Sequence, residues 1–297
     1  MPKPIIAVSG KQGQLGSELQ QLATVYPAYE FVFAGRDVLD LTDRSSIEHF
    51  FQQYKPLFFI NCAAYTAVDK AEQDKDNAFK INASAVGTIA TLCEQYQATL
   101  IHISTDYVFN GLGSKPCQPD DKTDPVNYYG ETKLQGEQLA LSNCSRTIII
   151  RTSWVYSVFG HNFVKTMLRL MKERKEISVV NDQLGSPTYA KDLAAAILSV
   201  IDGLSHASPA ASGLYGIYHF SNAGVISWFD FAVAIRDKSG LDCRVLPIPT
   251  TSFPTPAKRP SYSVMDTGKI ISQFNFPLKK WTDSLDECIG LLQAKEA

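Results

Sequence analysis

The chain begins with a short apolar run that three evenly spaced glycines follow at once. The run Ile5–Val8 is typical of a strand buried on both faces, and Gly10, Gly13 and Gly16 come directly after it. The leucines that follow recur with the period of a helix. Glycine lets the main chain turn tightly and approach a ligand closely, and a helix that begins there offers free N–H groups and a positive dipole end. This order of strand, loop and helix predicts a pyrophosphate site in a nucleotide-binding α/β fold.

The alternation of strand and helix continues over the first half of the chain. Apolar runs near residues 31–34, 57–60, 100–103 and 147–150 predict strands, and helical patterns separate them. Such alternation implies right-handed crossovers and a parallel sheet with helices on both faces. The fold class we expect is α/β, a Rossmann-type doubly wound parallel sheet with a smaller C-terminal substrate-binding lobe.

The pattern changes after Trp154. Residues 162–175 and 192–200 are predicted helices, and residues 247–260 hold five prolines, which exclude a regular helix or a central strand. We expect a dinucleotide-binding domain over residues 1–155, completed by segments near 186–222. A substrate-binding lobe would cover residues 156–185 and 223–297. A ligand would bind in the crevice between the sheet and this lobe.

Composition excludes several other classes of protein. Lys and Arg total 28 against 30 for Asp and Glu, a net charge of −2, so no basic field would attract nucleic acid or anionic lipid. No apolar run reaches the roughly 18 residues of a membrane span, and the N-terminus lacks the pattern of a signal peptide. The six cysteines are scattered without a metal-binding spacing. We therefore expect a cytoplasmic protein with no metal site and with neither a nucleic-acid nor a membrane partner.

A second group of residues indicates catalysis. Tyr129 and Lys133 are four residues apart on a predicted helix, so they share a face, with Cβ atoms about 5–6 Å apart. An ammonium beside a phenol lowers the phenol pKa from about 10 and brings it toward the range of a general acid. Thr105 follows a predicted strand, at the sheet edge where ligands bind. The Tyr-x-x-x-Lys pattern alone is usually surface decoration, but with the glycine loop and Thr105 it favours a catalytic site.

Several longer stretches match a known enzyme family. Asn61–Glu72 and Ser104–Phe109 are the specific ones, whereas the glycine loop and the Tyr-x-x-x-Lys pair mark only the superfamily. Arg151–Tyr156, Gly185–Thr188 and Arg259–Pro260 also match, so the likeness extends from Gly10 to Pro260. The chain thereby resembles the dTDP-4-dehydrorhamnose reductase family of extended short-chain dehydrogenases/reductases. The resemblance implies reduction of the C4 ketone of dTDP-4-dehydro-6-deoxy-L-mannose by NAD(P)H to dTDP-L-rhamnose, for cell-surface polysaccharide synthesis.

The resemblance also implies roles for single residues. Tyr129 would protonate the ketone oxygen, Thr105 would hydrogen-bond it, and Lys133 would tune Tyr129 and reach the nicotinamide ribose. These three are the expected catalytic residues. The expected cofactor-binding residues are Gly10, Lys11, Gln12, Gly13, Gln14, Leu15, Gly16, Arg36, Asp40, Leu41, Ala63, Ala64, Tyr65, Tyr129 and Lys133. The expected substrate-binding residues are Val68, Asp106, Trp154 and Arg259, the last with its guanidinium on the nucleotide diphosphate.

Two cations favour NADPH over NADH. Arg36 follows the second predicted strand, where the 2′ position of a ribose would lie, and Lys11 lies in the glycine loop. Asp37 would repel a 2′-phosphate if its side chain pointed inward. NADPH is the cofactor we expect, with NADH as the alternative. Some relatives are associated with a divalent cation at a subunit contact, but Lys191 lies where a carboxylate would be needed, so we expect no metal.

Two other functions stay open at this point. One is a nucleotide-sugar epimerase or dehydratase of the same fold, although a dehydratase would carry Glu where Tyr107 follows Thr105 and Asp106. The other is a non-catalytic, dinucleotide-binding regulatory subunit resembling that of methionine adenosyltransferase, which the intact Thr105, Tyr129 and Lys133 disfavour. The partner we expect is a small-molecule dTDP-sugar. The assembly is left open, with a homodimer among the options.

Overall fold

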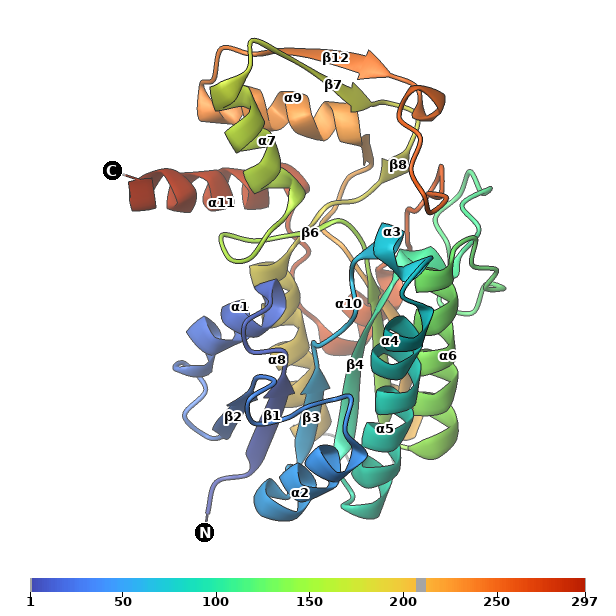
Figure 1. The fold of residues 1–297 in the computed structure, drawn as a ribbon. Helices are drawn as coiled ribbons and strands as arrows, with labels where there is room; N and C mark the ends of the chain where they lie inside the picture. Colours follow the sequence, from blue (N-terminus) through green and yellow to red (C-terminus); the bar gives the residue numbers. More distant parts are fainter. Residues whose placement is uncertain (1, 207–211, 297) are drawn as a thin grey trace.

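The computed structural model describes residues 2–206 and 212–296. Within them, a six-stranded sheet has the order β10-β5-β4-β3-β1-β2, and all of its pairings are parallel (Figure 1). The strands are β1 (Ile5–Ser9), β2 (Glu30–Ala34), β3 (Phe58–Asn61), β4 (Thr99–Thr105), β5 (Thr147–Thr152) and β10 (Gly216–Phe220). The predicted α/β class is confirmed.

Helices cover both faces of this sheet, which explains why its strands are mostly apolar. Ile6 and Val8 pack with α1 (Gln14–Ala23), α8 (Ala190–His206) and α10 (Gly268–Phe274). Ala7 points to the other face, toward α2 (Arg44–Tyr54), α5 (Ala85–Gln95) and α6 (Tyr128–Asn143). The sequence placed α10 in the lobe, but its Ile270 and Phe274 belong to the core of the sheet.

The segment between β3 and α5 is an interrupted helix. It consists of α3 (Val68–Ala71), α4 (Lys75–Phe79) and a π-helical turn, η1 (Lys80–Ser84). The turn carries Asn82, whose side chain bonds both main-chain groups of Tyr65 and the hydroxyl of Thr132. These contacts tie the segment after β3 to α6, so the interruption lies next to the site described below.

The remaining elements form a separate layer above the sheet (Figure 1). They are β6 (Val155–Tyr156), α7 (Phe163–Glu173), β7 (Glu176–Val180), β8 (Leu184–Gly185), β9 (Thr188–Tyr189), β11 (Ile226–Ser227), α9 (Trp228–Ser239), β12 (Arg244–Ile248) and α11 (Trp281–Glu296). Short 3₁₀ turns are η2 (Asp106–Val108), η3 (Ser212–Leu214) and η4 (Thr250–Ser252). Met167, Ile177, Phe231 and Val245 belong to the hydrophobic cluster of this layer, which is distinct from the two clusters of the sheet. The predicted domain boundaries stay a prediction.

The order of the strands determines where a ligand can enter. The chain leaves β1 for β2 on one side, while β3 lies on the other side of β1. In doubly wound sheets the crevice at such a switch point, at the carboxyl ends of the strands, is the usual ligand site. The glycine loop and the Asn61–Glu72 stretch both begin there. Among the described helices, none has both the length and the apolar character needed to cross a bilayer.

Candidate active site

The glycine loop is packed so closely that two of its positions accept no side chain. Gly10 has φ +76°, and a Cβ there would lie 2.9 Å from the Ala63 nitrogen. A Cβ on Gly16 would lie 2.2 Å from the Gly10 carbonyl oxygen. Helix α1 starts just after Gly13, and within the described structure no side chain caps that end and no acidic residue occupies its first turn. The loop therefore fits a pyrophosphate, whose charge the helix end would stabilise.

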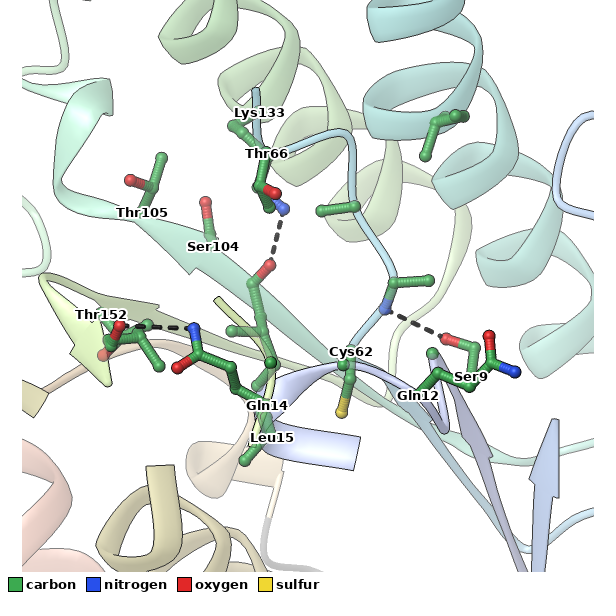
Figure 2. Close-up of a pocket in the computed structure, with 18 of the residues that line it drawn as sticks. Ser9, Gln12, Gln14, Leu15, Cys62, Thr66, Ser104, Thr105, Lys133 and Thr152 are labelled. Carbon is green, nitrogen blue, oxygen red and sulfur yellow. Dashed lines mark hydrogen bonds between the residues drawn. The ribbon is translucent and has the colours of Figure 1, made fainter. Parts of the chain in front are cut away.

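A cavity of about 700 Å³ extends from this loop along the carboxyl edge of the sheet (Figure 2). Most of the predicted site residues line it, namely Gly10, Lys11, Gln12, Gly13, Gln14, Leu15, Arg36, Asp40, Leu41, Ala63, Ala64, Val68, Thr105, Asp106, Tyr129, Lys133 and Trp154. A volume of this size is in the range of small-molecule sites. Of the predicted residues that the structure describes, Gly16, Tyr65 and Arg259 do not line the cavity.

Those three residues have other contacts. Gly16 packs under Gly10 in the glycine loop. The Tyr65 hydroxyl donates to Asp74 Oδ2 at 2.9 Å. The Arg259 guanidinium donates to Asp69 Oδ2 at 2.8 Å and to the Ala257 carbonyl oxygen at 3.0 Å. The role of Arg259 on a diphosphate stays a prediction, and Arg259 would have to leave Asp69 to fill it.

The end of the cavity next to β2 carries the cations Arg36 and Lys11 and the carboxylate of Asp40. Arg36 is exposed and lines the cavity. Asp37, of which the sequence left the direction open, accepts from Lys11 Nζ at 3.2 Å and is not a lining residue in the described structure. The Lys11 ammonium lowers the pKa of the Asp37 carboxyl. Asp37 therefore does not oppose a phosphate beside Arg36, which favours NADPH as the sequence predicted.

Helix α6 brings Tyr129 into the cavity. Its N-cap is Asn127, whose Oδ1 accepts from the Gly130 N–H at 2.8 Å. Tyr129 is buried with its ring edge-to-face on Tyr107, and burial raises the pKa of its phenol. Tyr128, one position earlier, lies outside the cavity lining of the described residues, with Lys75 Nζ 5.0 Å from its ring centroid. The predicted helix register therefore places Tyr129, and not Tyr128, at the site.

Thr105 and Asp106 form a hydrogen-bonded pair at the end of β4. Thr105 Oγ1 donates to Asp106 Oδ1 at 2.9 Å and accepts from the Tyr107 N–H at 3.2 Å. Burial raises the pKa of Asp106 to about 6. Its other oxygen, Oδ2, is buried and has no hydrogen-bond partner of good geometry among the described residues, although the Ser263 hydroxyl is close enough to lower the pKa of the carboxyl. A buried oxygen without a partner is costly, so a hydroxyl of a ligand in the cavity would satisfy Asp106.

Lys133 differs from the sequence expectation in its contacts. We expected its ammonium beside the Tyr129 phenol, but Nζ donates to the Ile103 carbonyl oxygen on β4 at 2.6 Å (Figure 2). It also lies 3.4 Å from His102 Nε2. The lysine stem is long enough to reach across to this buried acceptor. Burial lowers the pKa of Lys133 to about 8. Burial also raises the pKa of Tyr129, and this effect is larger than the lowering by the hydrogen bond with Thr105.

Among the parts of the cavity wall that the sequence did not predict is the loop before α7. Gly160 and His161 line the cavity opposite the glycine loop. Gly160 has φ +63°, and a Cβ there would lie 3.0 Å from Gln14 Cγ. Asn162 Nδ2 donates to Gln14 Oε1 at 3.0 Å. The only signal in the sequence is a glycine just before a capping asparagine, and nothing local indicates which loop it faces.

Trp154 is held at the cavity by a stack of aromatic rings. Its ring lies 3.6 Å from that of Trp228 with an angle of 11° between the planes. Its φ of +49° is rare for a residue with a side chain. Such strain persists only where the surroundings fix the residue, so the indole is held firmly in the cavity wall. The expected absence of a metal stays a prediction, and Lys191 pairs here with Glu287.

A dinucleotide cradle that opens onto a buried tyrosine and lysine on one helix is the arrangement of the short-chain dehydrogenases/reductases. Comparison with known proteins identifies one family within this class. The model of the family "RmlD substrate binding domain" matches residues 4–294. The chain belongs to this family, the dTDP-4-dehydrorhamnose reductases.

Individual relatives cover almost the whole chain. It is 40% identical over 285 residues to the spore coat polysaccharide biosynthesis protein SpsK of Bacillus subtilis, with 95% of each chain covered. It is 40% identical over 287 residues to dTDP-4-dehydrorhamnose reductase of Escherichia coli K12, covering 93% of this chain and 94% of that one. The Bacillus anthracis dTDP-4-dehydrorhamnose reductase, solved in complex with NADP, has a TM-score of 0.91 and 38% identity, covering 98% of this chain and all (100%) of that chain.

Proposed function

We propose that this protein reduces the C4 ketone of dTDP-4-dehydro-6-deoxy-L-mannose to give dTDP-L-rhamnose, with NADPH as the preferred reductant and NADH as the alternative. One observation carries the proposal: Thr105, Asp106 and Tyr129 line the same cavity as the glycine loop. The family, and the NADP named with the Bacillus anthracis relative, support the choice of substrate and cofactor. The residues present fit the cofactor because the loop leaves room for a pyrophosphate and Arg36 lies at the cavity end.

The side chains of the site match the needs of this reduction. Bound NADPH would supply a hydride to the carbonyl carbon, and negative charge then develops on the ketone oxygen. Tyr129 donates its phenolic proton to that oxygen, and its raised pKa keeps it protonated until then. Thr105 can hydrogen-bond the same oxygen once its hydroxyl turns away from Asp106. The products are the C4 alcohol, the oxidised cofactor and a Tyr129 phenolate, which takes up one proton before the next turnover.

Two further statements belong to this proposal. We place the enzyme in the cytoplasm, because its six cysteines, all in described parts of the chain, are free thiols and NADPH is an intracellular reductant. A homodimer stays a prediction, which light scattering of the purified protein would test.

The direct test is consumption of NADPH. The absorbance of NADPH should fall when dTDP-4-dehydro-6-deoxy-L-mannose is made in situ by an upstream epimerase. The Tyr129→Phe variant provides the matched control, because it keeps the cradle and loses the acid. If neither NADPH nor NADH is consumed, the proposed function is wrong.

A second measurement separates a reductase from an epimerase. A reductase releases its oxidised cofactor in each turnover, whereas an epimerase keeps NAD⁺ bound and regenerates it. Heat-denatured purified protein should therefore release little nucleotide. Near-stoichiometric NAD⁺ would instead favour an epimerase or dehydratase.

A further inference from the structure

A row of buried polar side chains crosses the sheet beneath the cofactor loop. Ser9 on β1, Asn61 on β3 and His102 on β4 are cross-strand partners in register, and Lys133 of α6 continues the row. Each is at most 2% exposed. Lys133 already has a place in the proposed reaction, but the other three have none. Buried polar groups need hydrogen-bond partners, so the direction of each bond in the row can be worked out.

The direction follows from the orientation of the Asn61 amide, and the row begins at a main-chain group that can only donate. The Ala63 N–H donates to Ser9 Oγ at 3.4 Å (Figure 2). The Ser9 hydroxyl in turn donates to Asn61 Oδ1 at 2.7 Å. The amide of Asn61 therefore presents its N–H group to His102 Nδ1, at 3.2 Å. Every donor in this series of hydrogen bonds points toward His102.

This direction decides which ring nitrogen of His102 carries the proton. The imidazole is fully buried, and burial together with the nearby Lys133 holds the pKa of His102 well below its usual range, so it is neutral. A neutral ring that accepts at Nδ1 carries its hydrogen on Nε2. That N–H faces Lys133 Nζ at 3.4 Å. An ammonium has only donors and is opposed by this N–H, whereas a neutral amine has a lone pair that accepts it.

We propose that His102 is a positioning residue for Lys133: its Nε2–H, directed by the Ala63–Ser9–Asn61 chain, stabilises the neutral amine relative to the ammonium. The longer contact to His102, against 2.6 Å to the Ile103 carbonyl, agrees with an ammonium that avoids the ring N–H. The proposal deepens the proposed function, on which its catalytic meaning rests. A lysine that gives up its proton readily is a better proton source for Tyr129 after each turnover.

The other charged and titratable groups around Lys133 act differently. Tyr129 lies one turn earlier on α6 and Glu137 one turn later. Glu137 raises the pKa of Lys133, but it is paired with Arg151 of β5 at 2.7 Å. On β4, His102 is the titratable group that faces Nζ. Because Tyr129, Glu137 and Arg151 stay in place when His102 or Ser9 is replaced, a change in the titration of Lys133 would report on the row itself.

The test is a direct titration of Lys133 in the free protein. In protein with ¹³C-labelled lysine, the Cε signal missing from Lys133→Met identifies Lys133, and its midpoint should lie at about 8. The His102→Leu variant removes the ring N–H and should raise the midpoint by about one unit, a tenfold change in proton affinity. A lower midpoint would show that His102 accepts from the ammonium, and an unchanged one that His102 only packs. Either result would overturn the proposal.

A milder variant protects the test against loss of folding. Ser9→Ala removes the hydroxyl that directs Asn61, so the amide and the His102 tautomer become free to reverse, and the midpoint should rise although His102 is intact. Thr99→Val, which removes a buried hydroxyl on β4 outside the row, should leave it unchanged. If Ser9→Ala also leaves it unchanged, the directed chain does not exist. Because the titration needs no substrate, failure of the reductase assay would leave its result intact.

Discussion

At the scale of single residues, the two adjacent tyrosines at the start of α6 give the clearest test of which side chain is the catalytic acid. Neighbouring helix positions diverge by about 100°, so one phenol enters the cavity and the other does not. Tyr129→Phe should lower kcat by about 10²–10⁴-fold, because general acid catalysis contributes that much, with dinucleotide affinity little changed. Tyr128→Phe should keep most of the activity. Steady-state kinetics and a fluorescence titration with NADPH check both, and a dead Tyr128→Phe beside an active Tyr129→Phe would refute the assignment.

A second residue, Arg36, should decide the choice of cofactor. We predict that its guanidinium contacts the 2′-phosphate of NADPH, because Arg36 lines the cavity while Asp37 pairs with Lys11. Arg36→Ala should therefore raise the KM for NADPH about tenfold or more, since a charged hydrogen bond contributes about 1.5–3 kcal/mol. The KM for NADH should stay nearly constant and serves as the internal control. Equal increases for both cofactors would show that Arg36 only supports the local loop.

At the scale of elements, a buried ion pair joins α6 to β5. Arg151 Nη2 lies 2.7 Å from Glu137 Oε2, and each side chain is 2% exposed. Glu137→Leu should lower the free energy of unfolding by about 3–5 kcal/mol, because it leaves a buried guanidinium without its counter-charge. The double variant Glu137→Leu/Arg151→Met, which removes both charges, should be more stable than the single variant. Urea denaturation measures both, and a double variant that loses the sum of the two single losses would contradict this account.

Elements also show how far sequence reasoning reaches. The strands of the sheet were predictable because most are buried on both faces, as in Ile5–Val8, and each contains an apolar run. The strands of the separate layer above the sheet were not predictable. Strands of two residues, such as β6 and β9, in which Val155 pairs with Thr188, are too short to show a periodic pattern. Likewise α10, between a proline-rich segment and the C-terminus, gave no sign that it packs on the sheet.

The site also has a part that the sequence predicts and a part that it does not. Tyr129 and Lys133 were predictable as a pair because they are four residues apart on one helix. The acceptor of Lys133 was not, because Ile103 and His102 meet it only through the packing of α6 on β4. Ser9 and Asn61 join His102 only once the register of three strands is known. Local spacing thus predicted the Tyr129–Lys133 pair, whereas the long-range register of the strands decides which groups these residues contact.

At the scale of the whole molecule, the proline-rich segment near the C-terminus is fastened beside the site by hydrogen bonds to Asp69 and Asn127. Asp69 of α3 accepts from the Arg259 guanidinium at 2.8 Å and from the Ala257 N–H at 3.1 Å. Asn127, the N-cap of α6, donates to the Lys258 carbonyl oxygen at 2.8 Å. Segments 131 to 190 residues apart in the sequence therefore meet beside the cavity. Arg259 either keeps this segment in place or turns to a substrate phosphate.

These two roles of Arg259 predict different kinetics. If Arg259 turns to the nucleotide diphosphate, Arg259→Ala should raise the KM for the dTDP-sugar about tenfold or more and leave the KM for NADPH unchanged. Asp69→Ala should then lower the KM for the sugar nucleotide, because the guanidinium no longer has to leave a carboxylate. We expect this pair of opposite effects in steady-state assays of the two variants. If both variants raise the KM for the sugar nucleotide equally, the ion pair acts by holding residues 254–262 against α3. Arg259 would then have no contact with the phosphates.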